Sequence, residues 1–130
     1  MTTTPEEHQK IKVFGRKKGK LRPDEVARME QQLPGMSPPE AADRNALRRG
    51  LGLDAGEGRI WLEIGFGNGA TLAELAARHP QDRFIGVEVF WEGIVSLMKR
   101  LDENGSDNVR VVRESAQWLL DGHLPPGSVD

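Results

Sequence analysis

The sequence predicts an α/β fold with a parallel, doubly wound sheet. Short apolar strand patterns alternate with amphipathic helix patterns three times between residues 59 and 120, and parallel strands need helical crossovers of this kind. The first strand runs directly into a loop with glycine at alternate positions, Gly65, Gly67 and Gly69. Such a loop, at the first strand–helix turn of a wound sheet, lets the backbone approach a nucleotide-like ligand closely.

Length and composition limit the number of domains and the classes of site that the chain can contain. A chain of 130 residues is long enough for one domain. The net charge of −2 indicates no class of partner, but seven Lys and Arg residues and no acidic residue lie between Lys10 and Arg22. Such a run is either a solvated arm or a tail that contacts phosphate groups. The absence of cysteine excludes disulfides and cysteine metal sites. No signal peptide or membrane span is recognisable, so we expect a cytoplasmic protein without membrane contact.

Residues 1–55 are expected to form a basic, partly disordered N-terminal extension with one or two short helices. The first 22 residues are polar and lack periodicity, which is typical of disorder. A short helix opens at Pro23, where proline is tolerated, and Pro34-Gly35 is predicted to end it. Residues 40–51 carry a second, weaker helix pattern.

Residues 56–130 are expected to form the first half of a ligand-binding domain. Strands are expected at 60–64, 84–88 and 109–113, and helices at 70–79, 92–104 and 116–120. The helix over 92–104 has the clearest apolar stripe, and Gly105 suits a left-handed C-cap. Strand one would be an open edge with nothing beside it. Pro125 to Asp130 would lead to a fourth strand, so we expect the N-terminal part of a longer protein.

Two cofactor classes fit the glycine loop. Gly65, Gly67 and Ala70 match the dinucleotide pattern Gly-x-Gly-x-x-Gly/Ala, whereas the three alternating glycines match the Glu-x-Gly-x-Gly-x-Gly pattern of methyltransferases that use S-adenosylmethionine. Glu88, at the end of strand two, does not separate the classes, because both place a carboxylate there on the ribose hydroxyls. A strand-end surface charge is the alternative for Glu88.

Glu63 favours S-adenosylmethionine. It lies inside an otherwise apolar strand, two residues before the first glycine. A buried carboxylate needs a partner, and the anionic pyrophosphate of a dinucleotide would be repelled by it. The sulfonium and ammonium groups of S-adenosylmethionine would be attracted. The alternative is that Glu63 pairs with a structural arginine or with backbone N–H groups.

Three segments carry a more specific signal: Arg-Ile-Trp-Leu-Glu-Ile-Gly-Phe-Gly-Asn-Gly (59–69), Phe-Ile-Gly-Val-Glu-Val (84–89) and Asn-Val-Arg-Val-Val (108–112). Together they resemble the bacterial tRNA (guanine-N7)-methyltransferases, and the run LEIGFGNG is close to a signature of that family. The basic stretch from Phe14 to Pro23 resembles the leader of these enzymes. The resemblance implies a Rossmann-like class I methyltransferase fold, here an incomplete doubly wound sheet of three β–α units.

The resemblance also implies roles for individual residues. Glu63 and the loop of Gly65, Gly67 and Gly69 would hold the methionine end of S-adenosylmethionine, and Glu88 its ribose. The adenine would lie beside three residues, Val89, Ser115 and Ala116. Ser115 stands where the family usually has an Asp that accepts from the adenine amino group. The Ser115 hydroxyl can accept the same hydrogen bond from the adenine amino group, but without the help of a negative charge. The alternative is that Glu114 accepts this bond instead.

The implied activity is transfer of a methyl group from S-adenosylmethionine to guanine N7 in tRNA. The family's catalytic candidate is the Asp of a Pro-Asp-Pro-Trp segment after strand four. That segment would lie beyond Asp130, so no catalytic residue is assigned. The candidate RNA contacts are the basic leader residues Arg16, Lys17, Lys18 and Lys20.

Two other functions remain open: an inactive fragment that binds cofactor or RNA, and an NAD-dependent oxidoreductase fragment, which Glu63 disfavours. The three histidines are widely separated, so no metal site is expected. The three tryptophans are expected to pack in the core or at a pocket edge rather than to stack on bases. Trp91, three residues after Glu88, is the one candidate for a wall beside the adenine. We favour a monomer.

Overall fold

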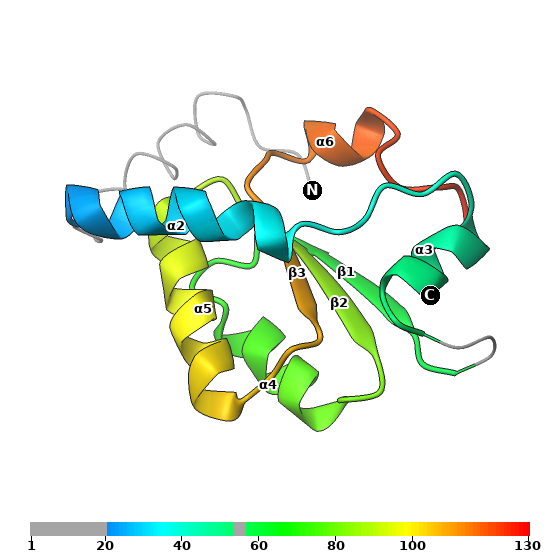
Figure 1. The fold of residues 1–130 in the computed structure, drawn as a ribbon, viewed down its shortest axis with the longest axis horizontal. Helices are drawn as coiled ribbons and strands as arrows, with labels where there is room; N and C mark the ends of the chain where they lie inside the picture. Colours follow the sequence, from blue (N-terminus) through cyan, green and yellow to red (C-terminus); the bar gives the residue numbers. More distant parts are fainter. Residues whose placement is uncertain (1–20, 54–56) are drawn as a thin grey trace, which may run out of the picture.

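The computed structural model describes residues 21–53 and 57–130. Its centre is a three-stranded parallel sheet in the order β1-β2-β3, made of β1 (Ile60–Ile64), β2 (Arg83–Val87) and β3 (Val109–Val112) (Figure 1). Helical crossovers join the strands, and the arrangement is Rossmann-like. The predicted fold class is therefore confirmed.

Helices lie on both faces of the sheet. On one face, α4 (Ala70–Arg78) and α5 (Trp91–Asn104) form the crossovers. The short helices α3 (Arg44–Gly50) and α6 (Gln117–Leu120) belong to the other face, and α2 (Pro23–Met36) crosses the end of the sheet (Figure 1). The strands and helices predicted between residues 60 and 120 are all found, and each predicted end lies within one residue of the observed end.

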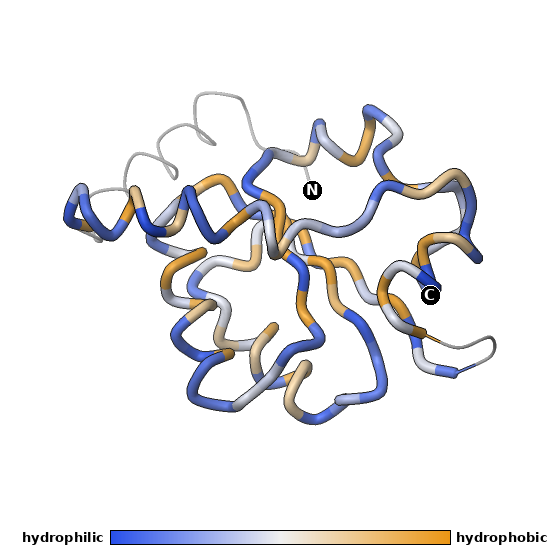
Figure 2. The backbone as a smooth tube through the Cα atoms, in the orientation of Figure 1, coloured by the Kyte–Doolittle hydropathy of each residue, from blue (hydrophilic) through white to orange (hydrophobic). Residues whose placement is uncertain are grey.

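Each face has its own apolar core, because neighbouring residues of a strand point to opposite sides of a sheet. On β2, Phe84 joins the cluster under α4 and α5, whereas Ile85 joins the cluster under α3. Figure 2 shows the apolar colouring concentrated on the strands and on the helix faces that meet them. Leu47, in α3, is fully buried beside Ile60, so the helix before residue 55 shares a core with the sheet. The domain division near residue 55 stays a prediction.

The prediction that Pro34-Gly35 ends the first helix is wrong, because α2 continues to Met36. Proline removes one backbone hydrogen bond from the last turn. Packing outweighs that loss, since Leu33 and Met36 both lie against the core cluster under α4 and α5. The helix ends instead at Ser37, whose backbone is extended, whose N–H donates to the Pro34 carbonyl and whose hydroxyl donates to the Leu33 carbonyl.

The prediction that β1 has nothing beside it is wrong at its first residue. The Asp130 N–H donates to the Ile60 carbonyl at 2.9 Å, and the Asp130 carboxylate accepts from the Ile60 N–H at 2.8 Å. The same carboxylate lies 2.8 Å from Arg44 and 3.8 Å from the buried Arg48. Asp130 thus links α3 to the free side of β1. The fourth strand stays a prediction.

We predict that Asp130→Ala destabilises the fold by about 1–3 kcal/mol, because it leaves the part-buried Ile60 N–H without its acceptor and removes the carboxylate that faces Arg44 and Arg48. Urea unfolding at neutral pH measures the difference. Glu103→Ala, at an exposed site on α5, is the matched loss of a carboxylate. Equal midpoints for the two variants would refute the role of Asp130.

Candidate ligand-binding site at the carboxyl edge of the sheet

The glycine loop between β1 and α4 needs glycine for two different reasons. Gly65, Gly67 and Gly69 have φ angles of 73°, 64° and 78°, which other residues rarely adopt. A Cβ atom on Gly65 or Gly67 would meet nothing within 4 Å, so these two residues face open space. A Cβ atom on Gly69 would lie 2.6 Å from the side chain of Leu97. The first two glycines leave room for a ligand, and the third lets α5 pack closely.

Glu88 binds the loop to the rest of the site. Its side chain is only 6% exposed, which excludes a surface charge. One carboxylate oxygen accepts from the Gly67 N–H at 3.0 Å, and the other accepts from the N–H groups of Val89 and Phe90 at 2.7 and 3.2 Å. Because a carboxylate oxygen can accept more than one bond, capacity remains for a ligand hydroxyl. The predicted ribose contact stays a prediction.

Helix α5 supports the back of the loop through Gly93, a residue that the sequence analysis missed. A Cβ atom there would lie 2.1 Å from the Gly67 carbonyl oxygen and 3.4 Å from the Glu88 side chain. Further along α5, Arg100 donates to the Asn68 carbonyl at 3.2 Å. The available signal was a glycine near the start of the best-patterned helix, where it is unfavourable unless close packing needs it.

Glu63 is the one carboxylate in β1, and it is half-buried. Within the part of the chain that the structure describes, its side chain forms no hydrogen bond or ion pair. The alternative pairing with a structural arginine or with backbone N–H groups therefore has no support among those residues.

The predicted adenine residues lie at the same edge of the sheet. The Glu88 N–H donates to the Val112 carbonyl at 3.1 Å, which joins the ends of β2 and β3. Ser115 and Ala116 follow β3 and are exposed, and the Ser115 hydroxyl oxygen accepts from the Gln117 N–H at 3.2 Å. Val89 is half-buried. The structure brings the loop, Glu88 and Val89 into direct hydrogen-bonded contact and places the other two residues one strand away.

Four predicted RNA contacts, Arg16, Lys17, Lys18 and Lys20, lie outside the described residues. Trp61 is a packing residue as predicted: it stacks on Phe84 with ring centroids 5.6 Å apart and donates to the buried Asp82 at 2.8 Å. In the described residues, no group of three or more His, Cys, Asp or Glu could hold a metal ion. No helix there is long and apolar enough to cross a membrane.

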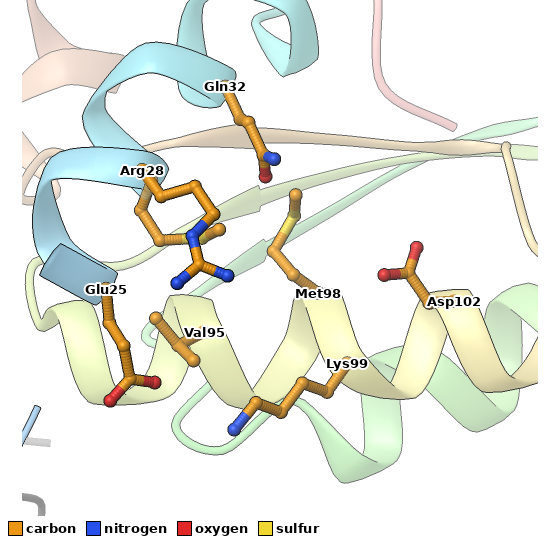
Figure 3. A pocket seen from close by; sticks show the side chains of 8 residues that line it. Glu25, Arg28, Gln32, Val95, Met98, Lys99 and Asp102 are labelled. Carbon is orange, nitrogen blue, oxygen red and sulfur yellow. The ribbon is translucent and has the colours of Figure 1, made fainter.

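A separate hollow of about 310 Å³ lies between α2 and α5, away from the glycine loop. Figure 3 shows Arg28 reaching from α2 toward Val95 and Met98 of α5, with Lys99 and Asp102 further along that helix. Side chains of both charge signs line it, so it favours no ligand charge. It contains none of the predicted cofactor residues.

Comparison with known proteins gives a family match. Residues 57–130 match the model of a family described as "Putative methyltransferase". The tRNA (guanine-N(7)-)-methyltransferase of Magnetococcus marinus is 48% identical over 123 residues, covering 94% of this chain and 49% of that protein. The enzyme of the same name from Alkalilimnicola ehrlichii is 38% identical over 121 residues, covering 92% and 50%. The chain therefore spans about half the length of these curated relatives.

Among solved structures, one similar chain is the C-terminal domain of precorrin-6Y C5,15-methyltransferase from Rhodobacter capsulatus. It shares 28% identity, and the match covers 62% of this chain and 42% of that one with a TM-score of 0.45.

We predict that Gly93→Ala destabilises the protein by about 1–3 kcal/mol, since the new methyl group would overlap the Gly67 carbonyl and displace the loop. Gly35→Ala is the matched control, because a Cβ atom there meets nothing within 4 Å. That helical change should be neutral or stabilising by up to about 1 kcal/mol. Urea unfolding of both variants tests this, and a neutral Gly93→Ala would show that the close approach is not required.

Proposed function

The chain belongs to this methyltransferase family, and from that premise we propose that residues 57–130 bind S-adenosylmethionine for methylation of guanine N7 in tRNA. The substrate and the site of methylation come from the names of the curated relatives. Since those relatives are about twice as long, we further propose that the 130 residues supply cofactor binding and that methyl transfer needs residues beyond them.

The observation that carries the cofactor proposal is the charge balance of the loop. Glu63 has no partner among the described residues. Two of the N–H groups that could attract an anion are already used: Gly67 donates to Glu88 at 3.0 Å, and Ala70 donates to the Asn68 side chain at 2.9 Å. The site therefore favours a cationic ligand over a pyrophosphate, which argues against an NAD-dependent oxidoreductase.

The residues fit the proposed cofactor. Gly65 and Gly67 leave open space over the loop, Glu63 offers a carboxylate that is unpaired among the described residues, and Glu88 retains capacity for the ribose hydroxyls. S-adenosylmethionine would supply an electrophilic methyl group bonded to sulfur. Guanine N7 has a lone pair and no proton, so methylation there needs no general base. The contribution of this chain is to bind the cofactor and to orient its methyl group, and such orientation can lower the barrier to methyl transfer by several kcal/mol.

We propose tRNA as the partner, with the basic leader residues, Arg16 to Lys20, contacting its phosphates, and the cytoplasm as the location. We favour a monomer. The support is the naming of the relatives as tRNA methyltransferases and the seven basic residues between Lys10 and Arg22.

We predict that Glu63→Gln weakens binding of both S-adenosylmethionine and S-adenosylhomocysteine by about tenfold, as expected when a charge-assisted hydrogen bond to an ammonium group is lost. Calorimetric titration measures both ligands, with NAD as the negative control and Glu103→Gln as the matched variant. Loss confined to S-adenosylmethionine would assign Glu63 to the sulfonium instead. Tight binding of NAD, or unchanged affinity in Glu63→Gln, would contradict the proposal.

We also predict that replacing Lys17, Lys18 and Lys20 with Ala lowers tRNA affinity and makes the dependence of log Kd on log salt concentration shallower, because fewer counterions are released. Binding is measured by fluorescence anisotropy at several salt concentrations. S-adenosylhomocysteine affinity should not change. An unaltered salt slope would refute the phosphate contacts.

A further inference from the structure

A second hollow of about 520 Å³ lies where the end of α2 meets the start of α5 and the residue after β3. Its volume is within the range of small-ligand sites, which is about 300–1,000 Å³. The lining residues come from these three places: Glu30, Leu33, Pro34, Ser37, Trp91 and Arg113. Trp91 is the one lining residue that was considered above for the cofactor, as a wall beside the adenine, and the other five have no role in the proposed cofactor site.

Trp91 and Arg113 form a stacked pair in this hollow. The guanidinium carbon of Arg113 lies 4.5 Å from the centroid of the Trp91 ring, which is within cation–π range. Trp91 is half-buried and packs against the core, so the platform is fixed from below. Arg113 is exposed, and its guanidinium makes no hydrogen bond or ion pair with the described residues. A guanidinium can stack on a second flat group through the face turned away from the indole.

Glu30, on α2, lines the same hollow. It is exposed and pairs neither with Arg113 nor with any other residue in the part of the chain that the structure describes. Two opposite charges therefore border one hollow without neutralising each other. A ligand that fits them has a flat ring for the guanidinium and hydrogen-bond donors for the carboxylate.

We propose that this hollow binds an unpaired guanine base of the RNA. The base stacks on the open face of Arg113, and its N1–H and N2 amino group donate to the two oxygens of Glu30. Guanine is the standard base with two adjacent donors of this kind, whereas adenine, cytosine and uracil place an acceptor beside each donor. Stacking on arginine and aromatic groups is the usual way to hold a single-stranded base.

The base bound here is not the one that is methylated. Methylation at N7 places a positive charge on the guanine ring. A guanidinium stacked on that ring would oppose this charge as it develops. The hollow instead reads a nucleotide near the target and thereby adds to RNA selectivity. This inference rests on the proposal that the protein acts on RNA.

The experiment measures fluorescence anisotropy of labelled single-stranded heptamers with the whole chain, with and without S-adenosylhomocysteine. The heptamers are UUUGUUU, the same sequence with inosine or adenine at the centre, and all-uridine. Inosine lacks only the N2 amino group. We expect guanine to bind on the order of tenfold tighter than uridine, as stacking of one base implies, with inosine between guanine and adenine.

Arg113→Ala should remove most of the affinity that the guanine heptamer gains over all-uridine. Glu30→Gln should abolish the preference for guanine over inosine. The matched controls, Arg49→Ala on α3 and Glu103→Gln on α5, remove the same charges from exposed sites and should keep both preferences. All four sites are exposed, so folding is expected to persist, and thermal unfolding verifies it.

Two results would overturn the inference. Equal loss of all-uridine and guanine heptamers in Arg113→Ala would make Arg113 a phosphate contact. Weaker S-adenosylhomocysteine binding in Arg113→Ala, with guanine preference intact, would make the hollow part of the adenine site. Failure of wild-type protein to bind S-adenosylhomocysteine would contradict the proposed function alone, since the guanine preference is measured without cofactor as well.

Discussion

The carboxylate of Glu88 is the interaction on which the site depends. It lies at the end of β2 and accepts hydrogen bonds from three backbone N–H groups. One belongs to the glycine loop after β1, and two belong to the turn that begins α5. A charged acceptor with several donors is stronger than a set of neutral bonds. The shape of the loop is therefore set by the chain itself before any ligand binds.

Close backbone packing completes this arrangement. Gly93 lets the first turn of α5 touch the Gly67 carbonyl, and Gly69 lets the next turn of α5, at Leu97, touch the loop. The glycines that face open space and the glycines that face the helix thus have separate structural roles. Substitutions at the second group should alter the loop without removing any atom that contacts a ligand.

The sequence predicted the sheet, its parallel order and the positions of the crossovers, because apolar strand runs and helix periodicity are local signals. Spacing also pointed to the loop residues and to Glu88, and the structure places Glu88 in hydrogen-bonded contact with the loop, whereas their ligand contacts stay predictions. Gly93 was missed because its role depends on the Gly67 carbonyl, 26 positions earlier in the chain. The helix end at Ser37 was missed for a similar reason: Leu33 and Met36 pack on a distant core that outweighs the local preference of Pro34.

The contacts of Asp130 could not be predicted either. Its pairing with Ile60 spans 70 positions, and no local pattern marks an aspartate as the acceptor for a strand edge. Long-range polar contacts of this kind are decided by the packed structure, whereas the hydrophobic pattern mainly decides which faces are buried. The same limit applies to the Trp91–Arg113 pair, which joins the start of a helix to the residue after a strand.

One glycine pattern can serve ligands of opposite charge, and the hydrogen-bond partners of the loop decide between them. In an anion-binding loop, N–H groups at the helix start point at a phosphate. Here the Gly69 N–H donates to the Phe66 carbonyl, and those of Gly67 and Ala70 donate to side chains of the chain itself. The carboxylates of Glu63 and Glu88 add negative charge beside the positive end of α4. Glycine spacing thus fixes the shape of the loop. The charge of the ligand that the loop favours depends instead on two side chains, Glu63 just before the loop and Glu88 at the end of the neighbouring strand.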